Sequence, residues 1–383
     1  MTTETMLRSL VAFDTTSRNS NLALIEFVAG FLEDHGIPST LVEDETGTKA
    51  NLWATIGPPG SDGVILSAHT DCVPIDGQAW TTDPFTITET GGRWYGRGTA
   101  DMKSFAASAL AAVPLFLEAG LRRPIHLALS YDEEVGGGGA RRLVSAMAAD
   151  GVTARWCVVG EPTSMQVVTA HKGIFTFVGN VSGKEAHSSL APNAVNAAEY
   201  AARLVVALQD FGREKAIEGP FDEVFDVAHT TVHVGVLHSG TALNIVPRHA
   251  ELEFEYRHLP EDDPGAIRQK IDRVVAGLAA EMGQADPECT IEIEVKAHLP
   301  ALDTDPGASV VGEVAELTDV QGVGKVAYGT EAGLFEETLG VPTVVCGPGS
   351  IEQAHRPDEF VDIAQVQMCD EFMARLATRL SAS

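Results

Sequence analysis

The sequence predicts an α/β fold in which a mostly parallel sheet is covered by helices and interrupted by an inserted α+β domain. Short apolar runs, bounded by glycine, proline, aspartate and serine, recur along the chain and are typical of buried parallel strands, although a buried helix has a similar composition. These runs are residues 64–66, 125–130, 156–159 and 342–346. Helical segments separate them, and this alternation indicates a sheet with helices on its faces.

Helices are predicted before, between and after these runs. Residues 3–36 have the pattern of two helices, and the second has an apolar face and stops at Gly36. Residues 105–120 are rich in alanine and leucine, and residues 141–149 form a further helical segment. An amphipathic helix is expected at residues 363–380.

The middle of the chain alternates apolar and polar residues, as half-exposed antiparallel strands do. Strands are predicted at residues 173–181, 231–236, 251–257 and 290–295, and helices at 193–208 and 263–282. Two helices on one face of an antiparallel sheet form a small α+β domain. Because 383 residues favour two domains, we expect a larger domain from residues 1–173 and 299–383 and an inserted one from residues 174–298.

The net charge of the chain limits the classes of partner that it can bind. There are 26 Lys and Arg residues against 54 Asp and Glu residues, a net charge of −28. Such a surface repels phosphate backbones and anionic lipids, so neither nucleic acid nor a membrane is expected as a partner. The start of the sequence lacks a signal peptide pattern, and five cysteines without CxxC spacing indicate neither a disulfide framework nor a structural zinc site. We therefore expect a cytoplasmic protein.

Five residues of metal-ligand type lie at or near the ends of the strand-like runs or in the loops that follow: His69, Asp101, Glu134, Glu161 and His355. Ligands bind beyond the carboxyl ends of strands in open α/β sheets, so side chains with this placement can converge. Two imidazoles and three carboxylates suffice for two divalent metals, and these donors suit zinc, cobalt or manganese. If Asp101 bridges, each metal receives one histidine and one terminal carboxylate.

Two acidic neighbours of these ligands complete the expected chemistry. Glu133 is not needed as a ligand, so it is free to take a proton from a water between the metals. Asp71 can hold the second ring nitrogen of His69. Taken singly, each residue has a plainer interpretation, because a lone histidine is more often a surface or core residue and Asp71 can be a turn residue. The shared placement of the set favours the metal site.

Several motifs then carry a resemblance that covers essentially the whole chain. The chain resembles the glutamate carboxypeptidase and aminoacylase-like family of co-catalytic zinc peptidases and deacylases. The motifs are SAHTDCVP at 67–74, GRGTADMK at 96–103, DEEVGG at 132–137, GEPT at 160–163, AHSS at 186–189, NIVP at 244–247 and GPGSIEQAHRPDE at 347–359.

The resemblance implies a role for each residue of the site. It places His69, Asp101 and Glu161 on one zinc and Asp101, Glu134 and His355 on the other, with cobalt as an alternative metal. It also implies Asp71 behind His69, Glu133 as general base, and a cis peptide between Asp101 and Met102.

The resemblance further implies that the inserted domain is a lid that dimerises and that His187 reaches the active site of the partner. Arg257 and Asn244 would bind the substrate carboxylate, which suits the bidentate geometry of arginine. A solvated strand arginine and a turn histidine are the plainer interpretations of Arg257 and His187. Glu331 is a hypothetical partner for a substrate ammonium.

The segment YGTEAG at 328–333 and the closing motif are most similar to the branch of the family that removes acetyl from N2-acetyl-L-ornithine in arginine biosynthesis. We therefore expect an amidohydrolase with this small-molecule substrate. The alternatives are a deacylase or desuccinylase of another N-acyl amino acid, such as succinyl-diaminopimelate, or a dipeptidase. An inactive metal-binding paralogue is the alternative outside the enzymes, and the presence of Glu133 beside all five ligands argues against it.

Overall fold

The computed structural model describes residues 1–60, 62–320 and 322–382. The chain divides into two compact units. Unit 1 comprises Met1–Ala170, Leu302–Lys325 and Thr330–Ser383, and unit 2 comprises His171–Ala301 and Val326–Gly329. These divisions lie three residues from the boundaries expected at 173/174 and 298/299.

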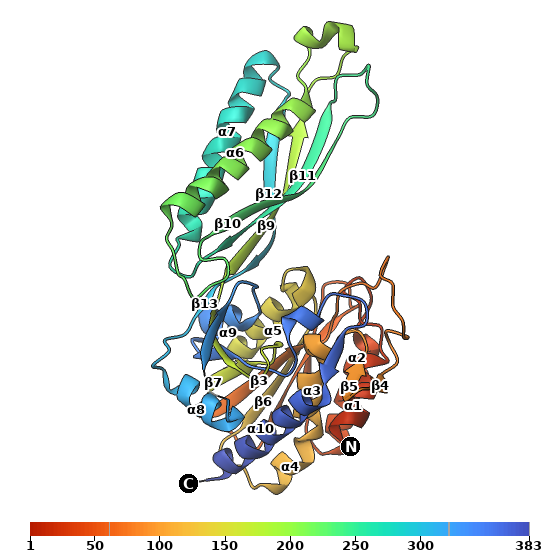
Figure 1. The fold of residues 1–383 in the computed structure, drawn as a ribbon, viewed down its shortest axis with the longest axis vertical. Coiled ribbons are helices and arrows are strands. Elements are labelled where there is room, and N and C mark those ends of the chain that lie inside the picture. The colour runs from red at the N-terminus through yellow and green to blue at the C-terminus, as the bar shows by residue number, and fades with distance from the viewer. Residues whose placement is uncertain (61, 321, 383) are drawn as a thin grey trace. The chain divides into compact units, whose positions relative to one another are not determined.

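Unit 1 is built on a sheet of nine strands whose centre is parallel (Figure 1). The order is β1-β2-β6-β3-β7-β15-β8-β13, with β14 paired to β8. The parallel strands are β6 (Ile125–Ser130), β3 (Gly63–His69), β7 (Ala154–Val159) and β15 (Thr343–Val345), which are the four apolar runs of the sequence. β1 (Ser39–Glu43), β2 (Ala50–Ile56) and β8 (Val167–His171) pair antiparallel, and β13 (Leu302–Asp303) and β14 (Val323–Val326) complete the sheet.

Strand β3 shows why this sheet has the predicted composition. All seven of its residues are buried, because it lies between β6 and β7 in the interior of the sheet. A parallel strand covered on both faces is apolar throughout rather than alternating. The strand therefore delivers its last residue, His69, to the end of the sheet from a rigid position.

Helices supply the cover of the unit 1 sheet, and their apolar faces join one core with the strands. The helices are α1 (Thr3–Val11), α2 (Leu22–Asp34), α3 (Ser104–Ala111), α4 (Val113–Glu118), α5 (Gly138–Ala149), α8 (Ser309–Thr318), α9 (Ala332–Leu339) and α10 (Ile363–Ser381). A small second sheet has the order β16 (Phe360–Asp362), β5 (Arg93–Tyr95) and β4 (Thr88–Thr90).

The helix predicted at residues 105–120 is interrupted. It is divided into α3 and α4 at Ala112, two residues before Pro114. Proline has no N–H to donate to the carbonyl four residues earlier, so it is favoured at the start of a helix rather than inside one. The stretch Thr99–Glu118 is long and apolar enough to cross a membrane, but 78% of its most apolar window is buried inside the protein, as in a core helix.

Unit 2 has an antiparallel sheet with two helices on one face (Figure 1). The strand order is β10 (Thr231–Ser239), β11 (His249–His258), β9 (Gly173–Ser182) and β12 (Thr290–Leu299). The helices are α6 (Ala197–Glu218) and α7 (Pro264–Ala285). Along β11 the residues alternate, so that Leu252, Phe254 and Tyr256 enter the core while Glu251 and Arg257 lie on the other face. The α+β architecture expected of residues 174–298 is present.

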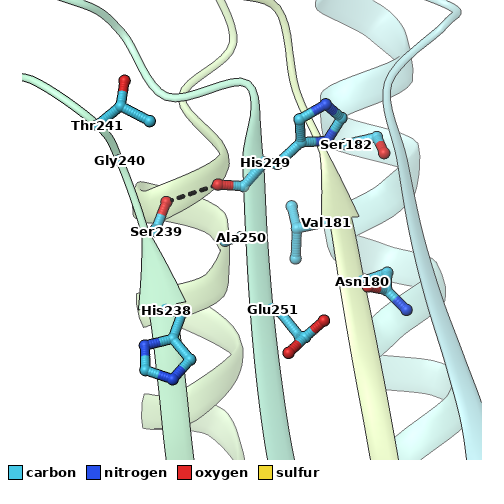
Figure 2. A pocket seen from close by; sticks show the side chains of 10 residues that line it. All are labelled: Asn180, Val181, Ser182, His238, Ser239, Gly240, Thr241, His249, Ala250 and Glu251. Carbon is cyan, nitrogen blue, oxygen red and sulfur yellow. Dashed lines mark hydrogen bonds between the residues drawn. The ribbon is translucent and has the colours of Figure 1, made fainter.

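One end of this sheet carries a shallow hollow of about 430 Å³ (Figure 2). Ser239 donates a hydrogen bond to the carbonyl oxygen of His249 across β10 and β11 over 2.8 Å. The side chains of His238 and Glu251 lie on paired positions of the same two strands. The lining residues come from strand ends and most of them are exposed, so this hollow does not have the buried, convergent polar groups that ligand-binding pockets have.

Candidate metal centre

The five expected ligands meet at one end of the unit 1 sheet. His69 is the last residue of β3, Glu134 lies in the turn η2 (Glu133–Val135) after β6, and Glu161 follows β7. His355 lies in the loop after β15, and Asp101 lies in η1 (Thr99–Lys103) immediately before α3. Adjacent parallel strands place their carboxyl ends side by side, which is why residues from four distant parts of the sequence converge.

Asp101 occupies the centre of the site. Its Oδ1 is 2.8 Å from Nε2 of His69, and its Oδ2 is 3.1 Å from Nε2 of His355. One carboxylate oxygen therefore faces each imidazole, as a bridging ligand requires. The peptide between Asp101 and Met102 is cis, in agreement with the expectation from the family resemblance.

Each imidazole also faces one terminal carboxylate. Nε2 of His69 lies 3.7 Å from Oε1 of Glu161, and Nε2 of His355 lies 3.0 Å from Oε2 of Glu134. Ligand atoms of His69, Asp101 and Glu134 lie within 4.8 Å of one another, and so do those of His69, Glu133 and Glu161. These two groups overlap the expected ligand sets without matching them, because the first contains His69 where His355 was expected and the second contains Glu133 where Asp101 was expected.

Burial and crowded negative charge govern the electrostatics. Burial, together with the charge of Asp101, raises the pKa of Glu134 to about 7. The same causes raise the pKa of Glu161 well above its ordinary value. Hydrogen bonds to Asp101 and Glu134 raise the pKa of His355 to about 10. The carboxylates outnumber the two imidazoles that neutralise them, so a divalent cation would favour their ionised forms.

The donor set fits two divalent metals. Imidazole nitrogen and carboxylate oxygen are ligands of zinc, cobalt and manganese. Oε1 of Glu134 is buried and has no hydrogen-bond partner among the described residues. A buried carboxylate oxygen without a donor is costly unless a cation or water satisfies it.

Asp71 joins His69 to the turn that carries Glu133. Its Oδ1 lies 3.5 Å from Nδ1 of His69, whose ring also contacts the Asp71 carbonyl oxygen at 3.0 Å. The same carboxylate accepts the backbone N–H groups of Glu133 at 3.1 Å and Glu134 at 3.3 Å, and the hydroxyl of Ser17 at 2.7 Å. Asp71 is therefore a buried support and not only a turn residue.

The surroundings of Glu133 change its affinity for a proton. Burial raises its pKa well above the ordinary value, the charge of His69 opposes this shift, and Glu134 and Asp101 add to it. A raised pKa makes a carboxylate more basic when it is ionised, which suits a general base.

A second buried support was not assigned a role from the sequence. Glu359 accepts the backbone N–H groups of Ala100 at 2.9 Å and Asp101 at 3.2 Å, and it accepts a hydrogen bond from Nη1 of Arg97 at 2.6 Å. Both side chains of the Arg97–Glu359 pair are 1% exposed. The signal was available, since both residues belong to quoted motifs, but sequence alone does not show that the two motifs meet.

A family model for peptidase family M20/M25/M40 matches residues 65–379. The chain belongs to this family. Among its relatives, the acetylornithine deacetylase of Myxococcus xanthus is 35% identical over 374 residues, covering 96% of this chain and 95% of the relative. The acetylornithine deacetylase of Proteus mirabilis strain HI4320 is 33% identical over 369 residues, covering 96% and 92%.

A solved structure from Bacillus subtilis, a dinuclear metal-binding peptidase of the M20 family, is similar with a TM-score of 0.69. It is 18% identical, and the match covers 98% of this chain and 97% of that one. At this identity the likeness establishes the fold. Family membership and the acetylornithine deacetylase relatives together make this M20 protein a metal-dependent hydrolase of amide bonds.

Glu331 of this M20 chain is not exposed. Its side chain is 0% exposed, and its two carboxylate oxygens accept hydrogen bonds from Ser67 and Ser130, each at 2.5 Å. Burial raises its pKa, while the two hydroxyls oppose the shift. The position does not support the role of ammonium partner, because neither oxygen is open to a ligand in this arrangement.

The remaining expected residues belong to unit 2. His187 is exposed, its Nδ1 lies 2.8 Å from Oγ of Ser189, and Ser188 donates to the carbonyl oxygen of Asn244 at 3.0 Å. The structure therefore brings the segments of His187 and Asn244 together. Arg257 lies near the opposite end of β11 and pairs with Glu255 over 2.8 Å, so the three residues do not form one cluster within unit 2.

Proposed function

We propose that this M20 protein hydrolyses the amide of an N-acyl amino acid, with N2-acetyl-L-ornithine as its substrate and acetate and L-ornithine as products. The observation that carries the proposal is the position of Asp101 between His69 and His355, with Glu133 beside the site. The acetylornithine deacetylase relatives support the choice of substrate, which would place the reaction in arginine biosynthesis.

The distances support the following ligand roles. His69, Asp101 and Glu161 would hold one metal, and Asp101, Glu134 and His355 would hold the other. When bound, a pair of divalent cations lowers the pKa of a water and polarises the carbonyl of the substrate. Zinc is the proposed metal, and cobalt has the same ligand preferences.

The protein residues then move one proton. A carboxylate oxygen of Glu133 accepts the proton of the attacking water and returns it to the amide nitrogen as the bond to the acyl carbon breaks. Asp71 keeps His69 in the tautomer whose Nε2 is free for a metal. The surroundings of Glu133, which is half-buried, raise its pKa and so raise the basicity that this step needs.

Unit 2 is proposed to complete the site. Arg257 and Asn244 would bind the substrate carboxylate, and His187 would stabilise the developing oxyanion in the partner of a homodimer. The exposure of His187 is compatible with a role outside its own unit. The five cysteines are buried and unpaired, which is compatible with the reducing cytoplasm.

The test is a comparison of kcat/KM for N2-acetyl-L-ornithine, other N-acetyl amino acids, succinyl-diaminopimelate and dipeptides. We expect the highest value for N2-acetyl-L-ornithine, loss of activity with a chelator, and recovery with zinc or cobalt. A higher value for succinyl-diaminopimelate or a dipeptide would move the protein to another branch. No turnover of any substrate with either metal would identify an inactive paralogue.

A further inference from the structure

Lys49 lies outside the metal ligands and has no role in the chemistry described so far. It immediately precedes β2, and its ammonium donates to the carbonyl oxygen of Ser17 and to Oδ1 of Asp132. The side chain of Lys49 is 15% exposed and that of Asp132 is 23% exposed. An ammonium group has three donors and no acceptor, so a shielded one requires partners of this kind.

The two acceptors of Lys49 belong to the two segments that hold Asp71. The hydroxyl of Ser17 donates to Oδ2 of Asp71, and the backbone of Glu133, the residue after Asp132, donates to Oδ1. The contacts therefore close a ring that runs from Asp71 through Ser17, Lys49 and Asp132 to Glu133 and back. Lys49 is the link that joins the N-terminal segment to the Glu133 turn.

The backbone of Asp132 gives this link a specific task. Asp132 has φ 57° and ψ 29°, in the left-handed region that residues with a side chain seldom adopt. Such a conformation persists where surrounding contacts enforce it. The side chain of Asp132 is held by Lys49, and its carbonyl oxygen accepts the N–H of Gly137 at 2.7 Å. Lys49 thus contacts the side chain of the residue through which the chain enters Glu133.

We propose that Lys49 is a positioning residue, which orients Glu133 through Asp132 and Ser17. The proposal rests on the proposed function for the role of Glu133 as base, but the predicted effect on the turn does not depend on the substrate. If Lys49 only stabilised unit 1, its loss would not act specifically on the Glu133 turn or on kcat. The exposed ion pair Arg142–Glu45, with side chains 42% and 83% exposed, contains no member of this ring of contacts.

The first measurement is hydrogen exchange of the metal-free protein, followed by mass spectrometry. Lys49→Met should speed exchange in the segments 15–20 and 131–137 and leave the strands of unit 2 unchanged, because only the ring of contacts is opened. Arg142→Met is the matched control, because it also replaces a cation by methionine but opens only the exposed pair between Arg142 of α5 and Glu45. Its exchange should be like that of the wild type. Unchanged exchange at 131–137 in Lys49→Met would overturn the proposal, whatever the enzyme hydrolyses.

The second measurement is steady-state kinetics on the metal-loaded enzyme. Lys49→Met should lower kcat by ~10–100-fold, the usual cost of losing a residue that orients a site, with KM and both metal equivalents retained. Lys49→Arg should restore most of kcat, because the guanidinium can bridge the same two oxygens. A loss of kcat that Lys49→Arg does not restore, or loss of a metal equivalent, would overturn a role in positioning the base.

A double-mutant cycle measures whether Lys49 and Asp132 act together. If Lys49 acts through Asp132, then Lys49→Met should add little to the loss of kcat already caused by Asp132→Asn. Fully additive losses would show that the lysine acts elsewhere. If the wild type turns over none of the offered substrates, the proposed function fails, and the exchange experiment still decides whether Lys49 holds the turn.

Discussion

Asp71 accepts a hydrogen bond from the backbone N–H of Glu133 over 3.1 Å. The same carboxylate lies 3.5 Å from Nδ1 of His69, so one buried group supports a ligand on β3 and the turn after β6. Burial disfavours the charge on Asp71, but its hydrogen bond to His69 and the charge of that ring outweigh the effect and lower its pKa. An ionised Asp71 therefore aligns the ligand and the proposed base together.

The division of roles between Glu133 and Glu134 can be tested by Glu133→Gln. The glutamine side chain has the size of the glutamate but cannot take a proton. The backbone N–H of residue 133, which donates to Asp71, is unchanged. We expect kcat to fall by ~10²–10⁴-fold, the usual contribution of general acid–base catalysis. Metal content, measured by elemental mass spectrometry after dialysis, should stay near two equivalents.

Glu134→Gln is the matched control for this pair. Its carboxylate faces His355 at 3.0 Å and is a proposed ligand, so this variant should lose a metal equivalent. If Glu133→Gln loses the metal and Glu134→Gln does not, the two roles are reversed.

The sequence predicted the convergence of the proposed ligand side chains better than the contacts that support them. His69, Glu134 and Glu161 each follow an apolar run, and the rule that sites form beyond the carboxyl ends of parallel strands brings them together without any knowledge of the loops. The support of Asp101 by Glu359 depends on where the closing loop lies against η1. That contact joins residues 258 positions apart and has no periodic signal in the sequence.

Glu331 shows a different limit of sequence analysis. The ammonium of ornithine suggested a substrate contact for this glutamate, yet Glu331 lies at the start of α9, where its carboxylate accepts hydrogen bonds from Ser67 of β3 and Ser130 of β6. A motif indicates that a residue type is needed but not whether its partner is a ligand or the protein. The break at Pro114 has a simpler cause, because the helical pattern of residues 105–120 conceals the missing N–H of the proline.

Glu331→Gln should act on stability and not on substrate choice. A glutamine can accept from one serine hydroxyl, but its N–H can only donate to the other, whose own O–H then loses its buried acceptor. We expect the free energy of unfolding to fall by about 1–3 kcal/mol, the cost of an unsatisfied buried polar group. The ratio of kcat/KM for N2-acetyl-L-ornithine to that for a neutral N-acetyl amino acid should not change. A collapse of that ratio would restore Glu331 as a partner of the substrate ammonium.

Arg257→Ala should reduce kcat/KM for substrates with a free α-carboxylate and spare their amide-capped analogues. The reason is that the proposed contact is a charge-assisted bond to the carboxylate, distant from the reacting atoms. Arg257→Lys should lose less, because it keeps the charge without the fork of donors.

Glu255 provides the control for Arg257, since it is the partner that holds the guanidinium at 2.8 Å. Glu255→Gln should leave the preference for free carboxylates in place. Equal losses on capped and uncapped substrates for Arg257→Ala would make the arginine a structural residue of β11.

His187 is expected to act across a dimer, so inactive Glu133→Gln and inactive His187→Ala chains should complement one another. In a mixed dimer, one site has its own Glu133 and receives His187 from the other chain, while the second site lacks both. Up to half of the wild-type activity per mixed dimer should return, because one of the two sites is whole. Ser189→Ala, which removes the hydroxyl 2.8 Å from Nδ1 of His187, is a milder variant that should stay active. If native mass spectrometry confirms mixed dimers and they have no activity, His187 does not contribute to the active site of the partner chain.

His171 should make the stability of the protein depend on pH. Its ring is 0% exposed, Nδ1 lies 3.0 Å from the carbonyl oxygen of Lys172, and Nε2 has no hydrogen-bond partner among the described residues. Burial lowers the pKa of His171 from 6.5 to about 4, so the folded protein holds the ring neutral where the unfolded chain is already protonated.

The sign of the effect follows from this difference. As the pH falls from about 6.5 to about 4, the unfolded chain takes up a proton that the folded chain does not, and the free energy of unfolding decreases. Below that range both states are protonated and the contribution of His171 no longer changes. The total contribution is on the order of 3 kcal/mol, at about 1.4 kcal/mol for each unit of pKa difference. His171→Gln, which has no titrating ring, should flatten the pH dependence in urea unfolding across this window, whereas His238→Gln on the exposed end of β10 should retain it. A His171→Gln profile as steep as that of the wild type would assign the acid sensitivity to the carboxylates instead.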